Sequence, residues 1–268
     1  MTEAEIIKNT PEPRTRQTLA VDLRQLGIEP AMALLVHSSL SSLGWVNGGS
    51  VAVIQALQDV LTPDGTLVMP AHSSDLSDPS GWQNPPVPES WVESIRQTMP
   101  PYDLRLTPTR GIGRIAEHFR TWPGVKRSDH PTLSFCAWGS QAETITRHHQ
   151  LEDSLGEGSP LAQLYELDGY VLLLGAGFES NTSFHLAEYR LPQRRDTTLG
   201  APILKDGEIQ WVTYVDVDLD ADPFPQLGQA FEREHDILTG MVGSATCLLF
   251  RQRDAVDFAV DWLNRHST

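Results

Sequence analysis

The sequence is poor in cysteine, in basic residues and in long apolar runs, and each scarcity excludes a class of protein. It has two cysteines in 268 residues, Cys136 and Cys247, each inside an apolar stretch. A disulfide framework or a cysteine-based zinc site is therefore not expected. No apolar run approaches the roughly 20 residues of a membrane-spanning helix, and the first residues lack the apolar core of a signal peptide. We expect a soluble, cytoplasmic protein without a membrane partner.

Basic residues are outnumbered by acidic ones. The chain has 20 Lys and Arg against 35 Asp and Glu, which gives a net charge of −15. Nucleic acid is a disfavoured partner, because its phosphates require a positively charged face. Two interpretations of the acidic excess stay open: it keeps the protein soluble, or it attracts a cationic small substrate.

The chain shows no internal repeat and no long linker. Residues 1–13 are polar and are expected to form a loosely ordered extension before one domain over residues 14–268. Short apolar runs typical of buried strands alternate with helical patterns, and the "KDGE" segment predicts a late β-hairpin. The sequence thus predicts an α/β fold, with one mixed, mostly buried sheet and helices on both faces. In the helix expected over residues 48–61, the apolar positions on one face are Val51, Ile54, Leu57 and Leu61.

Polar residues follow three of the apolar runs. His37, Ser38 and Ser39 end the first, His72 and Asp75 follow the second, and residues 175–188 follow the run "YVLLL". Active groups of α/β proteins collect at strand ends and in the loops beyond them. Three such ends in one chain indicate a shared cleft.

His185 and Glu188 lie three residues apart in a helix expected to begin near Asn181 or Thr182. Positions i and i+3 are neighbours on a helix, so Glu188 can orient the His185 ring and raise its basicity. This is half of a general-base arrangement, and the alternative is a surface His–Glu pair. His37 also has two interpretations: a buried histidine bonded to the backbone, or a cleft residue that assists proton transfer.

Residues 107–111 precede another predicted helix, whose free N–H groups favour a phosphate. The glycine spacing and lysine of a P-loop are absent. A metal site built from His72, Asp75, His130 and His185 is disfavoured, because no paired ligand motif such as HExxH occurs. The GxSxG motif of a nucleophilic serine is also missing.

Several stretches together resemble the aminoglycoside 3-N-acetyltransferase family. They are "LLVHSSLSSLGWVNGG", "GTLVMPAHS", "TPTRGIGRIAEHFRTWPGVKRSDHPTLSFCAWG", "EGSPLAQLYELDGYVLLLG" and "NTSFHLAEYR". The resemblance implies an α/β fold particular to this family and transfer of acetyl from acetyl-CoA to the 3-amino group of a 2-deoxystreptamine aminoglycoside. No metal is expected, and the oligomeric state is open.

The resemblance also assigns residues. It implies that His185 and Glu188 are the catalytic pair, and His37, from its place at a strand end, is expected to assist them. It places the pantetheine and acetyl end of the coenzyme at His37, Ser38, Ser39 and Leu40, and the CoA phosphates at Thr107, Thr109, Arg110, Gly111 and Ile112. Many members have Ser and Met where this chain has Thr109 and Ile112.

An aminoglycoside is a polycation, which gives the acidic excess a role. The carboxylates expected to bind it lie in predicted loops and helix ends: Asp75, Asp78, Glu152, Asp153, Glu157 and Glu232. His185 would remove the proton of the attacking amine. Three alternatives remain: an N-acetyltransferase acting on a different amine, a metal-dependent hydrolase using His72, Asp75 and His185, and a non-catalytic binding protein.

Overall fold

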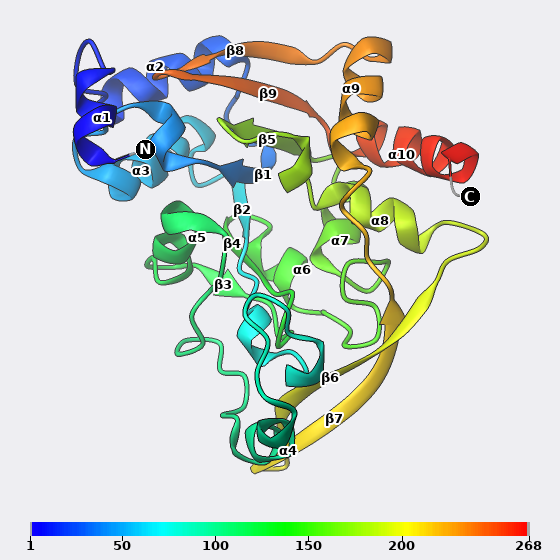
Figure 1. Ribbon diagram of the computed structural model, residues 1–268. Helices are drawn as coiled ribbons and strands as arrows, with labels where there is room; N and C mark the ends of the chain where they lie inside the picture. Colours follow the sequence, from blue (N-terminus) through cyan, green and yellow to red (C-terminus); the bar gives the residue numbers. More distant parts are fainter. Residues whose placement is uncertain (1, 267–268) are drawn as a thin grey trace.

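The computed structural model describes residues 2–266, and Figure 1 shows the course of the chain. The strands are β1 (Ala33–Ser38), β2 (Thr66–Pro70), β3 (Lys126–Arg127), β4 (Phe135–Gly139), β5 (Tyr170–Leu174), β6 (Asp196–Lys205), β7 (Glu208–Val217), β8 (Leu238–Val242) and β9 (Ala245–Arg251). The α-helices are α1 (Glu3–Lys8), α2 (Arg16–Leu26), α3 (Gly49–Leu61), α4 (Glu89–Thr98), α5 (Gly113–Arg120), α6 (Ala142–Thr146), α7 (Pro160–Glu166), α8 (Ser183–Tyr189), α9 (Phe224–Glu234) and α10 (Gln252–His266). Four short 3-10 helices are η1 (Leu40–Leu43), η2 (Ser74–Leu76), η3 (Pro79–Gly81) and η4 (Phe178–Ser180).

Seven strands form one mixed sheet in the order β3-β4-β2-β1-β5-β9-β8. At its centre β2, β1 and β5 are parallel, and β4 and β9 flank them in the antiparallel sense. Successive side chains of a strand point to opposite faces of the sheet. Leu34 and Val36 of β1 accordingly pack into one buried cluster, whereas Leu35 packs into another. The centre of the sheet is buried on both sides, as its uninterrupted apolar runs predict.

Helices cover both faces of this sheet (Figure 1). Helices α2, α3 and α5 contribute apolar side chains to the cluster on one face. Helices α6 to α10 contribute to the cluster on the other face. The predicted fold class, a mixed α/β sheet with helices on both faces, is confirmed. No helix in residues 2–266 is both long enough and apolar enough to cross a membrane.

The buried face predicted for residues 48–61 is wrong at one position. Val51 is 41% exposed, whereas Val53 and Val60 are at most 2% exposed. Helix α3 contacts α2 as well as β2 and α5. The buried face of α3 therefore also includes Val53 and Val60, and Val51 in the first turn faces outward.

Strands β6 and β7 form the predicted late hairpin, which extends away from the main sheet (Figure 1). Asp206 and Gly207 make its turn with φ angles of 52° and 83°, the positive values that a type I′ hairpin turn requires. Trp211 of β7 packs against a third small cluster, formed by Leu76, Met99 and Tyr102. The cluster connects the hairpin to the Pro- and Ser-rich segment 72–110.

The N-terminal segment, expected to be loosely ordered, contains helix α1. A capping box begins this helix: Thr2 accepts a hydrogen bond from the Glu5 backbone, and the Glu5 side chain accepts one from the Thr2 backbone. Farther on, Arg14 forms a parallel bridge with Val46. The polar composition of the segment therefore corresponds to an exposed helix that lies on the domain.

Candidate functional site

The carboxyl ends of β2, β1 and β5 lie at one edge of the sheet, because these strands are parallel neighbours. His37 and Ser38 end β1 and pair with Leu173 and Leu174 of β5. His72 follows β2, and helix α8 begins a few residues beyond β5. The expected convergence of three strand ends is confirmed, and it is the usual location of active groups in such sheets.

His185 and Glu188 lie one turn apart in α8, and their side chains face each other. His185 Nδ1 is 2.5 Å from Glu188 Oε2, and the side chains are only 14% and 10% exposed. A carboxylate can only accept a hydrogen bond, so Nδ1 carries the proton and Nε2 of the neutral ring is the acceptor. Their burial excludes the alternative of an ordinary surface pair.

Two contacts from the segment after β7 hold this pair in place. The backbone N–H of Asp220 donates to Glu188 Oε1 over 2.9 Å. The ring of Phe224 lies against the His185 ring, with 4.7 Å between the centroids. Both carboxylate oxygens of Glu188 are thus engaged, and the imidazole is held in one orientation with one tautomer favoured.

His37 belongs to the same cluster. Its side chain is 6% exposed, and its Nε2 lies 3.4 Å from the hydroxyl of Thr182, just before α8. Burial, followed by the repulsive charge of nearby His185, lowers the pKa of His37 to about 3. The ring is therefore neutral at physiological pH, and its neighbour is a side-chain hydroxyl at the start of α8.

His72 is a third histidine at this edge. Burial, followed by the charges of His185 and His37, lowers the pKa of His72 to about 3. Its ring meets Phe135 edge-on, with centroids 5.4 Å apart. Among the described residues its buried Nε2 has no hydrogen-bond partner. His72 is thus a neutral imidazole near His37 and His185.

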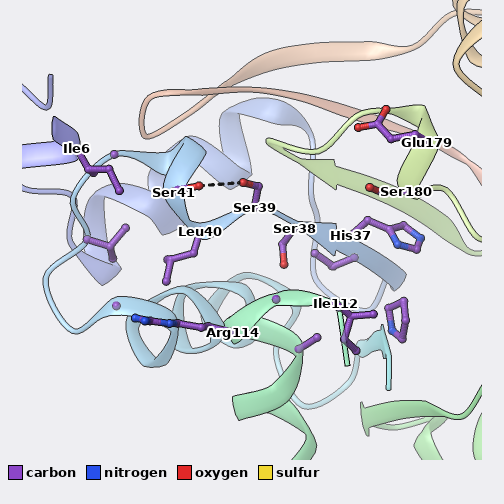
Figure 2. Close-up of a pocket in the computed structure, with 18 of the residues that line it drawn as sticks. Ile6, His37, Ser38, Ser39, Leu40, Ser41, Ile112, Arg114, Glu179 and Ser180 are labelled. Carbon is purple, nitrogen blue, oxygen red and sulfur yellow. Dashed lines mark hydrogen bonds between the residues drawn. The ribbon is translucent and has the colours of Figure 1, made fainter. Parts of the chain in front are cut away.

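A cavity of about 820 Å³ is lined by His37 and His72, and by Thr182 just before α8. Its wall comes from the end of β1, from η1, from the start of α5, from η4 and from α1, and Figure 2 shows the side chains that line it. Six of the residues predicted to bind the coenzyme line this cavity: His37, Ser38, Ser39, Leu40, Gly111 and Ile112.

The other three predicted coenzyme residues do not line it. Thr109 donates from its hydroxyl to Glu117 over 2.7 Å, and the carbonyl of Thr107 accepts from Arg127 over 2.6 Å. Arg110 forms an ion pair with Asp75 over 2.5 Å. These contacts shape the loop before α5, and they direct Thr109 and Arg110 toward acidic partners within the protein.

Arg114 is the cation that sequence reasoning did not assign. It lies in the first turn of α5, and its side chain lines the cavity (Figure 2). No ion pair is formed by Arg114 in the described part of the chain. The signal was present: Arg114 follows the glycines that open the predicted phosphate-favouring helix, whereas Arg110 precedes them.

The carboxylates predicted to bind the substrate are dispersed. Asp75 pairs with Arg110, and Glu157 pairs with Arg190 over 2.7 Å. Asp153 accepts from Gly158 N over 2.5 Å, and burial raises the pKa of Asp153.

The three remaining carboxylates do not line the cavity either. Glu152 and Glu232 are exposed, and Asp78 pairs with Arg96 over 2.7 Å. None of the six predicted carboxylates lines the cavity beside His37.

Asp216 is a buried carboxylate that the sequence analysis missed. It is 4% exposed and accepts from the Tyr189 hydroxyl over 2.7 Å and from Ser154 N over 3.1 Å. It thus joins the end of α8 to the loop around Ser154. It lies in an alternating polar and apolar strand, so nothing in its sequence context marks it as buried.

The metal-dependent alternative receives no support from the donor geometry. Within residues 2–266 no group of three or more His, Cys, Asp or Glu side chains is arranged to hold a metal ion. Of the three ligands considered, Asp75 is half exposed and pairs with Arg110. His185 directs Nδ1 to Glu188.

Together these features define a class of protein: an α/β enzyme with a buried histidine–carboxylate pair and a cavity at the ends of parallel strands. Residues 35–264 match the family model described as aminoglycoside 3-N-acetyltransferase. The chain therefore belongs to this family, and the predicted family and enzyme class, an acyltransferase, are confirmed.

Three relatives show how far the similarity extends. The SPbeta prophage-derived aminoglycoside N(3')-acetyltransferase-like protein YokD of Bacillus subtilis (strain 168) is 54% identical, over 96% of this chain and 95% of its own length. The aminoglycoside N(3)-acetyltransferase III of Pseudomonas aeruginosa is 38% identical over 94% of both chains. The structure of AAC-IIIb with CoASH has a TM-score of 0.83 and 33% identity, and the match covers 95% of this chain and 97% of that one.

Proposed function

We propose that this protein transfers the acetyl group of acetyl-CoA to an amino group of an aminoglycoside, at position 3 of the 2-deoxystreptamine ring. The observation that carries the proposal is the buried His185–Glu188 pair, 2.5 Å apart, together with the cavity that His37, Thr182 and Arg114 line. Family membership supplies the reaction class, and the names of the relatives supply the acceptor class.

His185 is the general base of this proposal. An aminoglycoside amine is mostly protonated near neutral pH, and only the free base attacks a thioester. Nε2 of His185 accepts the proton, and Glu188 stabilises the imidazolium that results. A positioned base of this kind contributes roughly 100- to 10,000-fold to the rate.

The cavity fits a coenzyme with a reactive end and an anionic end. His37 and Thr182 line it at the end near α8, and Ser38 to Leu40 continue the wall. Gly111 and Gly113 open α5, whose free N–H groups favour phosphate, and Arg114 adds a positive charge. When bound there, acetyl-CoA would supply an activated acetyl thioester. These residues would hold the thioester near His37 and the phosphates near Arg114.

Only some of the carboxylates predicted to bind the acceptor have side chains that are available for an ammonium group. Asp75 and Glu157 are each paired with an arginine. The side chains of Glu152 and Glu232 form no hydrogen bond or ion pair in the described part of the chain, and both residues are exposed. These two residues are the candidates for ammonium binding among the predicted carboxylates. In addition, the net charge of −15 attracts polycations to the protein in general.

A cytoplasmic location fits this proposal. Cys136 and Cys247 are free thiols in the buried core, as is usual in a reducing compartment. The cell interior also holds the acetyl-CoA pool that the reaction consumes.

The test is a thiol-release assay with acetyl-CoA and a panel of aminoglycosides that differ at the 3-amino group. We expect acceptor-dependent CoA release, with the acetyl group on the 3-nitrogen by NMR of the product. The control is an acceptor whose 3-amino group is already acetylated. CoA release with simple polyamines but with no aminoglycoside would replace the proposed acceptor with another amine. Absence of CoA release with every amine would overturn the proposal.

A further inference from the structure

Helix α1 forms a wall of the cavity, although it lies outside the part of the chain that matches the family model, residues 35–264. Glu3 and Ile6 of α1 line the cavity together with Trp45 and Val46. Figure 2 places Ile6 at the end of the cavity away from His37, with Leu40 and Arg114 between them. The N-terminal helix therefore faces the end of the cavity remote from the reactive histidines.

The helix has little stability of its own. It is six residues long, and none of its residues is buried. Isolated helices shorter than about 12 residues are marginal in water. The capping box at Thr2 and Glu5 satisfies backbone groups at its start but adds no apolar burial. The position of α1 thus depends on what it lies against.

The contacts of α1 with the domain are few and concentrate on Trp45. Thr10 accepts from the Trp45 backbone over 2.9 Å and donates to the Ile6 carbonyl over 2.7 Å. The indole N–H of Trp45 donates to Glu3 over 3.4 Å. Gly44 allows this approach, because a Cβ there would lie 2.9 Å from the Thr10 hydroxyl. Hydrogen bonds to Trp45 thus attach α1 to the domain, and Ile6 faces the cavity.

The proposed function fixes which part of the coenzyme reaches this end. The acetyl group must lie near His185 to be transferred. The rest of acetyl-CoA then extends past Leu40 and Arg114, so its nucleotide comes last. An adenine ring needs apolar surface on which to pack, and Ile6 beside Trp45 supplies such a surface.

We infer that α1 is a clamp for the nucleotide end of the coenzyme, with Ile6 closing the cavity over it. The inference rests on the proposed function. It adds a binding role for residues that precede the matched family region. Because α1 buries no side chain within the protein alone, a bound coenzyme supplies apolar contact that orders it further.

The chain offers a matched control for the test. Ile7 is the next residue of α1 and is 53% exposed. It does not line the cavity. Ile6→Ala and Ile7→Ala change helix propensity and side-chain volume equally, and they differ in that Ile6 lines the cavity whereas Ile7 faces outward. Calorimetry with coenzyme A should show Kd about tenfold higher for Ile6→Ala, the scale of a partly lost aliphatic contact. Ile7→Ala should stay near the wild type.

A shorter donor and hydrogen exchange give two independent readouts. S-acetylpantetheine carries the acetyl thioester without the nucleotide, so its KM should be the same in Ile6→Ala and the wild type. Coenzyme A should also slow amide exchange in residues 5–9 of the wild-type protein.

Equal coenzyme affinities for Ile6→Ala and Ile7→Ala, or unchanged exchange in residues 5–9, would overturn the clamp while leaving the transferase proposal intact. An equal loss with both donors would overturn it too. A wild-type protein that binds no coenzyme A would overturn both.

Discussion

Arg110 and Asp75 form an ion pair over 2.5 Å. The sequence analysis assigned Arg110 to the coenzyme phosphates and Asp75 to the cationic acceptor, yet each neutralises the other. Both side chains are about half exposed, and an exposed pair of this kind contributes little stability. The ion pair matters for function instead. It removes one positive charge from the residues predicted to bind the coenzyme phosphates and one negative charge from those predicted to bind the aminoglycoside.

Arg114→Ala should therefore weaken acetyl-CoA binding more than Arg110→Ala does. Arg114 lines the cavity at the start of α5, where a cation adds to the free N–H groups in binding phosphate. We expect KM for acetyl-CoA to rise about tenfold, the scale of one charge-assisted hydrogen bond. KM for the aminoglycoside should change little. Steady-state kinetics with each substrate varied in turn measures both.

Arg110→Ala is the matched control for that experiment, because it removes the same charge a few residues away. It should change KM for acetyl-CoA less than threefold. A larger effect of Arg110→Ala than of Arg114→Ala would restore the original assignment of Arg110 to the phosphates.

His185→Ala should abolish most of the acetyl transfer. Loss of a general base costs at least about 100-fold in kcat. The imidazole lies at the α8 end of the site, so the affinity for coenzyme A, measured by calorimetry, should stay within about twofold of the wild type. A variant that keeps more than about a tenth of the wild-type kcat would show that another group removes the proton.

Glu188→Gln should lower both kcat and stability. Glu188 accepts from His185 Nδ1 on one oxygen and from the Asp220 backbone on the other. A glutamine amide has a single oxygen, so one of these two donors loses its acceptor in a buried site. Such a loss costs about 1–3 kcal/mol. Chemical denaturation measures the stability, and kcat reports the weaker stabilisation of the imidazolium.

Glu234→Gln is a suitable comparison for Glu188→Gln, since Glu234 is an exposed carboxylate at the end of α9. It should leave kcat and the denaturation midpoint unchanged. If Glu188→Gln behaves in the same way, Glu188 neither orients His185 nor stabilises its charged form.

Much of the fold was predictable because local chemistry and burial agree. Gly27, with φ 110°, ends α2, and Pro160 occupies the first turn of α7, which are the positions that glycine and proline favour at helix ends. The hairpin turn at Asp206 and Gly207 was equally predictable from the sequence. Strand β8 was not predicted, because it is a short edge strand with mostly exposed side chains.

The site was predictable only in part. The pair His185–Glu188 is local, so helical spacing alone brings it together. Arg114, Asp216 and the contact of Asp220 with Glu188 depend on tertiary folding, which the spacing of residues along the chain does not encode. The carboxylates predicted to bind the substrate do not form one cluster for the same reason. Most of them pair with an arginine or a backbone N–H elsewhere in the fold.

Acid should destabilise this protein through four histidines, two of them buried (His37 and His130) and two half-buried (His72 and His149). Burial is the largest cause that lowers the pKa of His37, His72 and His149 to about 3 and the pKa of His130 to about 4. A histidine whose folded pKa lies below its unfolded value of 6.5 binds a proton more readily in the unfolded state. Stability is then complete above pH 6.5 and falls as the pH drops from there toward the folded pKa.

The slope of the unfolding free energy against pH tests whether these histidines stay neutral in the folded protein. Each such histidine contributes about 1.4 kcal/mol of unfolding free energy per pH unit between the two pKa values. Urea denaturation from pH 7 to pH 5 should therefore show a slope of several protons. His72→Gln should reduce that slope by nearly one proton, and it removes no hydrogen bond from the Nε2 atom, which has no partner in the described structure. The same change at the exposed His148 should leave the slope as it is. Equal slopes for His72→Gln and the wild type would mean that His72 does not stay neutral in the folded protein.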